Sequence, residues 1–230
     1  MLMTKSDVFN KKHEDMMTQD QRAILEELDL PPAVVSFLRK NLQTIYIIAA
    51  VLFIGLVLWE GYAKYISVQR EKSSGMLSEA MSAEPGSRAE QLKALTDKYS
   101  GSGSAVWAQV ELGHMALKDG KIQEAIGFYG KALDGLSRKN PMYPLVQYCL
   151  AQAYENAADT GKAKEAYQQL IDLPGFAAEG YLGLGRIAEI EGDLKQALEQ
   201  YKQYINQPEI TSGPTKEWVE SRISQLNGAQ

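Results

Sequence analysis

An uncharged stretch from Ile45 to Trp59, IYIIAAVLFIGLVLW, constrains the fold of this chain more than any other feature. Together with the four residues before it, it gives 19 consecutive residues without charge, and it contains no proline. At about 1.5 Å per helical residue this length reaches roughly 28 Å, close to the hydrocarbon thickness of a bilayer. Backbone amides in lipid have to be hydrogen-bonded internally, so we expect one transmembrane helix over residues 41–62.

Two other structures would use such a stretch, a buried core helix and a signal peptide. A core helix would show a polar stripe, and residues 45–59 have none. A signal peptide would start nearer the N-terminus and end at small residues, whereas about 40 residues precede this stretch. Aromatic side chains, which favour the headgroup region, mark both of its ends: Tyr46, Trp59, Tyr62 and Tyr65.

Residues 1–40 form a tail that we expect to be largely disordered up to residue 17. Thr18 and Gln21 have the spacing of a capping box, which predicts a short helix that runs to about Leu28. Pro31 and Pro32 would end this helix and open the next one, which leads into the membrane. That second helix is either a plain lead into the bilayer, which we favour, or a docking element for a partner.

The basic residues beside the span give only a weak indication of its orientation. Three lie before the span and three after it: Arg22, Arg39, Lys40, Lys64, Arg70 and Lys72. Arg39 and Lys40 are nearest to the lipid, which favours a cytoplasmic N-terminus.

The bulk composition excludes several classes of function. A net charge of −5 argues against a nucleic-acid partner, which would require a basic face. The histidines His13 and His114 lie far apart in the sequence and Cys149 is the only cysteine, so we expect no metal site, no disulfide and no histidine-based catalytic triad. The sequence also has no glycine-rich phosphate-binding loop, so we expect no cofactor, no small-molecule substrate and no enzymatic activity.

Beyond residue 100 the chain repeats itself. Similar segments begin at Leu112, Leu150 and Leu184, and each has an alanine and then a tyrosine at matching positions. The alanines and the tyrosines are each 38 and then 34 residues apart: Ala125, Ala163, Ala197, Tyr129, Tyr167 and Tyr201. A period near 34 built from two short amphipathic helices is typical of a helical solenoid, so we predict an all-α fold.

These residues resemble the tetratricopeptide repeat. That family has a large–small pair on its first helix, here Leu112-Gly113, Leu150-Ala151 and Leu184-Gly185. The large aromatic expected three residues earlier is met only by Tyr181. The resemblance implies three repeats over residues 101–210, after a degenerate first hairpin at 63–100.

A last helix, Thr215 to Leu226, is expected to cap the solenoid within residues 211–230. Its apolar side chains would seal the final hairpin, and they are Trp218, Val219, Ile223 and Leu226. Residues 100–104, SGSGS, are expected to form a turn.

In such a solenoid the first helices of the hairpins line the concave surface. The helical phase places eleven residues there: Trp107, Val110, His114, Lys118, Leu145, Tyr148, Gln152, Asn156, Glu179, Leu182 and Arg186. Aromatic, amide and cationic groups in this mixture suit an extended peptide. We select seven of them as binding candidates, with Arg186 as the first choice: Trp107, His114, Lys118, Tyr148, Gln152, Asn156 and Arg186. The alternative is that these residues are only the solvated side of a scaffold.

Other side chains of possible chemical interest have simpler roles. We expect His114 to be solvated, Cys149 to belong to the core, and the glutamates on these helices to be scattered surface acids. The glutamates are Glu111, Glu155, Glu179 and Glu189.

The whole layout, from about Pro31 to the C-terminus, resembles the YfgM-type family of ancillary subunits of the bacterial Sec translocon. The resemblance implies a single-pass inner-membrane protein with a cytoplasmic N-terminus and a periplasmic solenoid. Its partners would be translocon subunits and periplasmic chaperones.

Three functional hypotheses remain. The first is a membrane-tethered scaffold for protein export or envelope assembly. The second is a structural subunit of a stable membrane complex, in which small residues such as Gly55 and Gly61 let the span pack closely against another helix. The third is an enzyme with an unrecognised site.

Overall fold

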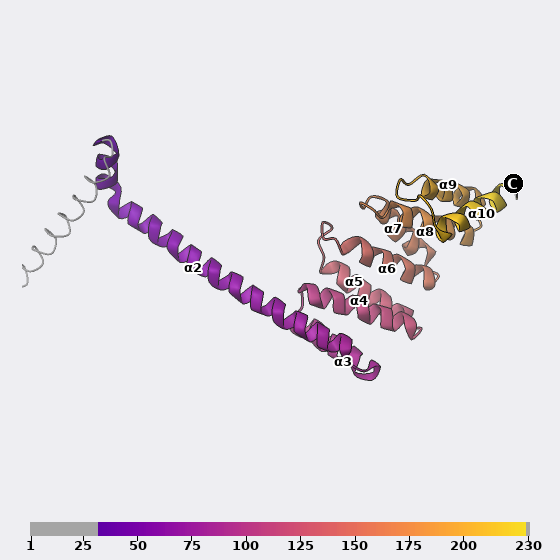
Figure 1. Cartoon of the computed structure of the whole chain (residues 1–230), viewed down its shortest axis with the longest axis horizontal. Coiled ribbons are helices and arrows are strands. Elements are labelled where there is room, and N and C mark those ends of the chain that lie inside the picture. Colours follow the sequence, from indigo (N-terminus) through magenta and orange to yellow (C-terminus); the bar gives the residue numbers. More distant parts are fainter. Residues whose placement is uncertain (1–31, 229–230) are drawn as a thin grey trace, which may run out of the picture. The chain divides into compact units, whose positions relative to one another are not determined.

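The computed structural model describes residues 32–228, and within this range every regular element is a helix (Figure 1). The predicted all-α fold is therefore confirmed. The elements are α2 (Pro32–Ser82), α3 (Pro85–Lys98), α4 (Gly103–Lys118), α5 (Ile122–Asp134), α6 (Tyr143–Asn156), α7 (Thr160–Ile171), α8 (Ala177–Ile190), α9 (Leu194–Ile205) and α10 (Pro214–Gly228). The predicted tail and its short helix, residues 1–31, lie outside the described residues.

The chain divides into two compact units, residues 1–65 and 66–230. The first unit holds the uncharged stretch, which lies within the long helix α2. This helix is long and apolar enough to cross a membrane, and the most apolar 18-residue window of its segment Gln43–Ser82 has a mean hydropathy of 2.1. None of that window is buried, and every large apolar side chain from Ile47 to Trp59 is more than half exposed. The alternative of a core helix is therefore wrong for this segment.

The second unit begins with the end of α2, which pairs with α3 and α4. Ala80, Leu92 and Leu95 are fully buried there against Leu112 of α4. The buried hydroxyl of Ser73 donates a hydrogen bond of 3.2 Å to the Ser104 hydroxyl. The expected turn at residues 100–104 is shorter than predicted. Ser102 caps α4 by accepting a hydrogen bond from the Ala105 amide, and the helix itself begins at Gly103.

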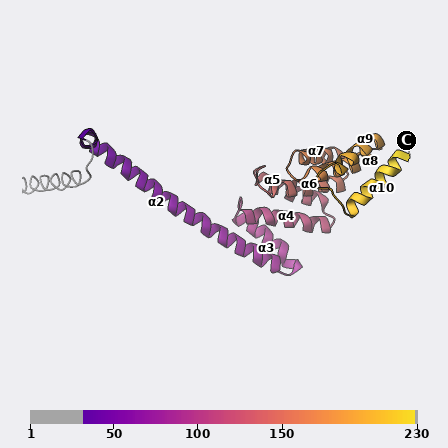
Figure 2. The same ribbon diagram turned by 45° about the horizontal axis from the view of Figure 1, so that its top comes forward.

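Three helical hairpins follow, α4–α5, α6–α7 and α8–α9, and the views of Figures 1 and 2 show them in sequence order with α10 beside α9. Two residues after the first helix of each hairpin ends, a left-handed residue turns the chain into the second helix. Gly120, Ala158 and Gly192 occupy this position with φ of 73°, 55° and 79°. Only Ala158 carries a Cβ, which is sterically unfavourable in this conformation.

The repeated tyrosines lie in the core of the hairpins, as the sequence predicts. Tyr129, Tyr167 and Tyr201 are all fully buried. Small residues lie against their rings. A Cβ added at Gly113 would come within 2.5 Å of Cε1 of Tyr129, so this crossing requires glycine.

The C-terminal helix α10 covers the last hairpin with Val219 and Leu226, which are both buried. Trp218 was expected to seal the hairpin together with them, and 47% of it is exposed. Its ring lies edge-on to Tyr201 with the centroids 5.8 Å apart. Trp218 therefore covers the tyrosine without being enclosed.

Candidate protein-binding surface

The surface formed by α4, α6 and α8, the first helices of the three hairpins, is termed the first-helix face below. On α4, Trp107 is 46% exposed, and His114 and Lys118 are also exposed. Val110 was predicted beside them but is only 1% exposed, because it packs into the core with Tyr129.

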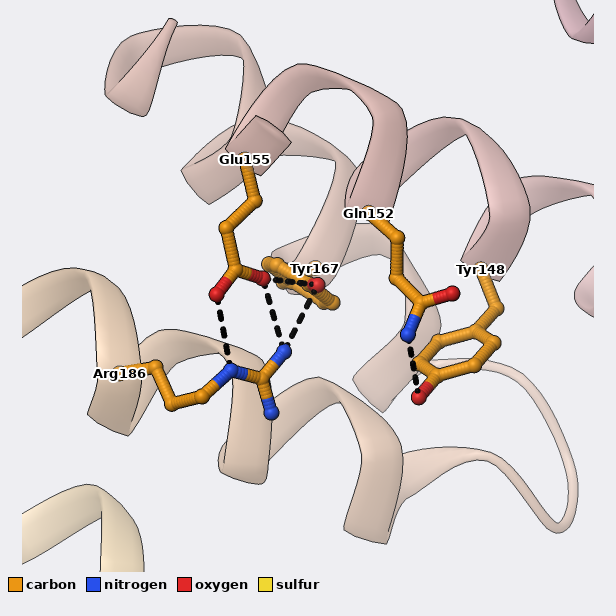
Figure 3. A network of polar contacts seen from close by, with 5 residues as sticks. All are labelled: Tyr148, Gln152, Glu155, Tyr167 and Arg186. Atoms are coloured by element: carbon orange, nitrogen blue, oxygen red, sulfur yellow. Dashed lines mark hydrogen bonds and ion pairs between the residues drawn. The ribbon is translucent and has the colours of Figure 1, made fainter. Parts of the chain in front are cut away.

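On α6 and α8, Asn156 is exposed, whereas Tyr148, Gln152 and Arg186 are partly buried. Figure 3 shows two hydrogen-bonded sets, Tyr148 with Gln152 and Arg186 with Glu155 and Tyr167, and the ring of Tyr148 lies edge-on to that of Tyr167. The structure therefore brings three of the seven residues that we selected for binding into one place.

Arg186 is held by Glu155, which lies on the neighbouring helix α6. Its Nε donates to Oε1 of Glu155 at 2.8 Å, and its Nη2 donates to Oε2 at 2.8 Å (Figure 3). The Tyr167 hydroxyl donates to the same carboxylate at 2.5 Å and accepts from Nη2 of Arg186 at 3.0 Å. Bidentate pairs of this kind are strong and fix the geometry of both partners.

This network changes the acid–base properties of its members. Burial alone would raise the pKa of Glu155, but hydrogen bonds from Arg186 and Tyr167 outweigh it and hold that pKa below its usual value. Burial and the hydrogen bond to Glu155 raise the pKa of Tyr167. The hydrogen bond to Glu155 raises the pKa of Arg186. The ion pair is thus fully formed at neutral pH.

A second copy of this pair lies one repeat further on. Nε of Arg222 in α10 donates to Oε1 of Glu189 in α8 at 2.8 Å, and hydrogen bonds from Arg222 lower the pKa of Glu189. Glu155 and Glu189 are 34 residues apart, the same spacing as between Tyr167 and Tyr201. Both glutamates were expected to be scattered surface acids. That expectation is wrong, because each joins one hairpin to the next helix.

The junction between the first two hairpins has no such pair. Leu117 takes the place of the glutamate, and the buried hydroxyl of Tyr129 has no hydrogen-bond partner among the described residues. The Sγ of Cys149 lies 3.7 Å from Nε2 of His114, whose Nδ1 is 3.8 Å from Glu111.

Cys149 packs at the edge of the core, as expected, and burial raises the pKa of its thiol. A raised pKa disfavours the nucleophilic thiolate. Within residues 32–228, no three histidine, cysteine or acidic side chains are grouped closely enough to hold a metal ion.

Tyr148 and Gln152 complete the group on α6. Nε2 of Gln152 donates to the Tyr148 hydroxyl at 2.9 Å, and the Tyr148 ring lies edge-on to Tyr167 with the centroids 6.5 Å apart (Figure 3). These contacts fix the Tyr148 ring and leave its hydroxyl proton free to donate.

A cleft that sequence reasoning missed lies between the end of α2 and α3. Its volume is about 730 Å³, and its lining includes Lys72, Glu79, Lys98 and Tyr99. The Nζ of Lys98 is 5.5 Å from the centroid of the Tyr99 ring. The lining residues share no pattern with the repeats, so the period gave no indication of the cleft.

Stacked helical hairpins with buried tyrosines, small residues at the crossings and a capping helix define the class of helical-repeat proteins. A family profile described as the tetratricopeptide repeat-like domain matches residues 36–227, and the chain belongs to that family. A search of curated protein sequences gives no match.

Solved structures with a similar fold include two repeat proteins. The crystal structure of MamA aligns with a TM-score of 0.51 and 20% identity, covering 62% of this chain and 76% of that one. Nearly identical TPR-like repeats from a Podosopora anserina protein described as a kinesin light chain align with a TM-score of 0.53 and 19% identity, covering 72% and 88%. At these identities the similarity concerns the fold alone.

Proposed function

We propose that this protein is a membrane-anchored scaffold that binds other proteins on its first-helix face. Domains of the tetratricopeptide class bind proteins and are generally not catalytic. The observation that carries the proposal is the combination, on this face, of a half-exposed tryptophan, Trp107, with polar side chains fixed by a network, Tyr148 and Arg186. Exposed aromatic and arginine side chains are enriched where proteins bind one another.

The anchor in this proposal is the apolar part of α2, residues 41–62, inserted in lipid. The exposure of its large apolar side chains supports this role, because a water-soluble protein rarely exposes so large an apolar surface. We place the chain in the bacterial inner membrane with a cytoplasmic N-terminus and a periplasmic solenoid. Translocon subunits and periplasmic chaperones are the partners that we propose. Reporter fusions after Ser102 and near Lys5 test the topology, and a cytoplasmic signal at Ser102 would contradict it.

A photo-crosslinking experiment tests protein binding directly. A benzophenone amino acid replaces Trp107 in the full chain, and the matched control carries it at Lys131, an exposed residue of the second helix α5. We expect crosslinks to envelope proteins in intact cells from position 107 and not from position 131. Equal crosslinking from both positions, or none from position 107, would refute binding at this face.

A second function rests on the span itself, as a structural subunit of a stable membrane complex. A Cβ built at Gly55 or Gly61 meets no atom within 4 Å, so both positions leave space for another helix to approach closely. Purification in mild detergent distinguishes the two functions, since a structural subunit would remain with its complex and a lone monomer would exclude this alternative.

We propose no catalytic role. His114 is the natural test residue, because it lies beside both Glu111 and Cys149. We expect His114→Ala to leave growth and envelope integrity unchanged, and a loss of either would reopen the enzyme hypothesis.

A further inference from the structure

Arg186 is the cation best placed to bind a partner, but its charge is already balanced. Two of its nitrogens bind Glu155 in a bidentate pair, and its side chain is only 29% exposed. An arriving carboxylate would have to compete with Glu155 for the guanidinium, and it would meet no net positive charge there.

Arg186 and Tyr148 nevertheless still have hydrogens to donate. The third guanidinium nitrogen, Nη1, forms no hydrogen bond with the described residues, and in Figure 3 it lies on the side of the guanidinium away from Glu155. The Tyr148 hydroxyl accepts from Gln152, so its own proton is available. Both groups can donate to a neutral acceptor such as a peptide carbonyl.

An unpaired acceptor lies in the same region. Oε2 of Glu179, in the first turn of α8, is buried without a hydrogen-bond partner among the described residues. Burying a carboxylate oxygen without a donor is costly, so a second anion brought beside Glu179 would be disfavoured. Glu179 precedes Arg186 by seven residues on α8, so the two residues lie on the same side of that helix. Burial raises the pKa of Tyr148 on the neighbouring helix α6, Arg186 lowers it, and the negative charge of Glu179 raises it.

The charges of Glu155 and Arg186 cancel, so the pair offers an arriving anion no net positive charge. A peptide main chain suits these groups, because it carries no charge and its carbonyls can accept hydrogen bonds from Arg186 and Tyr148. Its amides add hydrogen-bond donors in alternation with the carbonyls. Free C-termini and acidic side chains offer acceptors only, and they bring a negative charge.

We propose that the α6–α8 part of the first-helix face binds an internal, extended segment of its partner through neutral main-chain groups, and that it discriminates against free C-terminal carboxylates and acidic side chains. This inference rests on the proposed function, because it names the kind of segment that the same face would hold. Glu155 is the specificity-determining residue, since it cancels the charge of Arg186.

The test uses the full-length protein in detergent and a positional-scanning library of N-acetylated nonapeptides. Each mixture is made in two forms that differ only at the C-terminus, a carboxamide and a free carboxylate. Binding is measured by competition against a fluorescent member of the library. We expect the wild-type protein to bind the carboxamide forms at least threefold more tightly, and to disfavour Asp and Glu relative to Asn and Gln.

Two matched variants test whether Glu155 causes the preference for the carboxamide. Glu155→Gln frees the charge of Arg186, so we expect the preference to reverse toward carboxylate by several-fold. Glu189→Gln removes the equivalent charge one repeat away, and we expect the wild-type preference to persist.

The outcomes separate this inference from the proposed function. A wild-type preference for carboxylate overturns the inference, as does a preference that Glu155→Gln leaves unchanged or that Glu189→Gln shifts equally. These results leave protein binding itself intact. If the wild-type protein binds neither form of any mixture, the proposed function fails and the inference fails with it. The ratio measured on the wild-type protein requires no variant to fold.

Discussion

Replacing Gly113 with alanine tests the packing of the repeats at one atom. In an open helix this change stabilises a protein by about 1 kcal/mol, because alanine has the higher helix propensity. Here the new Cβ would lie 2.5 Å from Cε1 and 2.7 Å from Cζ of Tyr129. Carbon atoms pack at about 3.5–4.0 Å, so the ring would have to move by about 1 Å.

Tyr129 has no room for that movement, because it is fully buried. Overpacking of a well-packed core costs about 1–3 kcal/mol, which cancels or exceeds the gain in propensity. The control is Gly127→Ala in α5, where the glycine is exposed and a Cβ meets nothing within 4 Å. Only the gain in propensity remains at that position.

The assay is thermal unfolding of the full chain in mild detergent, followed by circular dichroism at a helical wavelength. We expect Gly127→Ala to be more stable than Gly113→Ala by about 2 kcal/mol, which corresponds to a difference in Tm of about 4–8 °C for a domain of this size. If Gly113→Ala raises Tm as much as Gly127→Ala does, the close approach to Tyr129 is wrong.

Four further predictions concern single side chains. Glu155→Gln should lower the free energy of unfolding by about 1–2 kcal/mol, because it removes a charged hydrogen-bond partner from Arg186, and urea titration measures this loss. The folded pKa of Glu155 and of Glu189 lies below the unfolded value of about 4.3, so their stabilisation is complete above that pH and is lost as the pH falls through the lower folded values. Unfolding midpoints measured from pH 6 to pH 3 should therefore fall less steeply for Glu155→Gln than for the wild-type protein, and equal slopes would contradict the assignment. Ala158→Gly should stabilise by about 0.5–1 kcal/mol by relieving a left-handed alanine, and a lower Tm would show that the strain is absent. Burial raises the pKa of Cys149, so its thiol should react with a disulfide reagent at pH 8 more slowly than free cysteine, and an equal rate would contradict its burial.

Much of the fold followed from periodicity. The tyrosine and alanine spacings predicted the hairpins because the crossing of two helices demands a small residue, and the gap beside it demands a large one. The apolar stretch at Ile45–Trp59 was equally informative, since its uniform composition leaves few structures open to it. Val110 was wrongly predicted to be exposed because the helical phase assumed for α4 was inaccurate. A rotation of a helix by a few tens of degrees about its axis moves a side chain from the surface into the core.

The candidate site was harder to predict. Arg186 was selected from its position, but its partner Glu155 lies 31 residues earlier on another helix. No local pattern links two such residues. A signal did exist in the 34-residue register, since Glu155 and Glu189 fall at the same place in successive repeats and Arg186 and Arg222 follow at nearly equal distances. Aligning polar positions as well as apolar ones would have found both pairs.

The ion pairs also have a consequence for how such an array can lengthen. The α8–α9 hairpin presents an arginine, Arg186, to the unit before it and a glutamate, Glu189, to the unit after it. If this hairpin were duplicated in tandem, the arginine of each copy would therefore meet a glutamate of the unit before it, and its glutamate would meet an arginine of the unit after it. The first hairpin carries a leucine, Leu117, where that glutamate would stand, so a copy of it would bring no acid for the arginine of the next unit. A duplicate of the α8–α9 hairpin would thus keep the ion pair at each of its junctions, whereas a duplicate of the first hairpin would lack it.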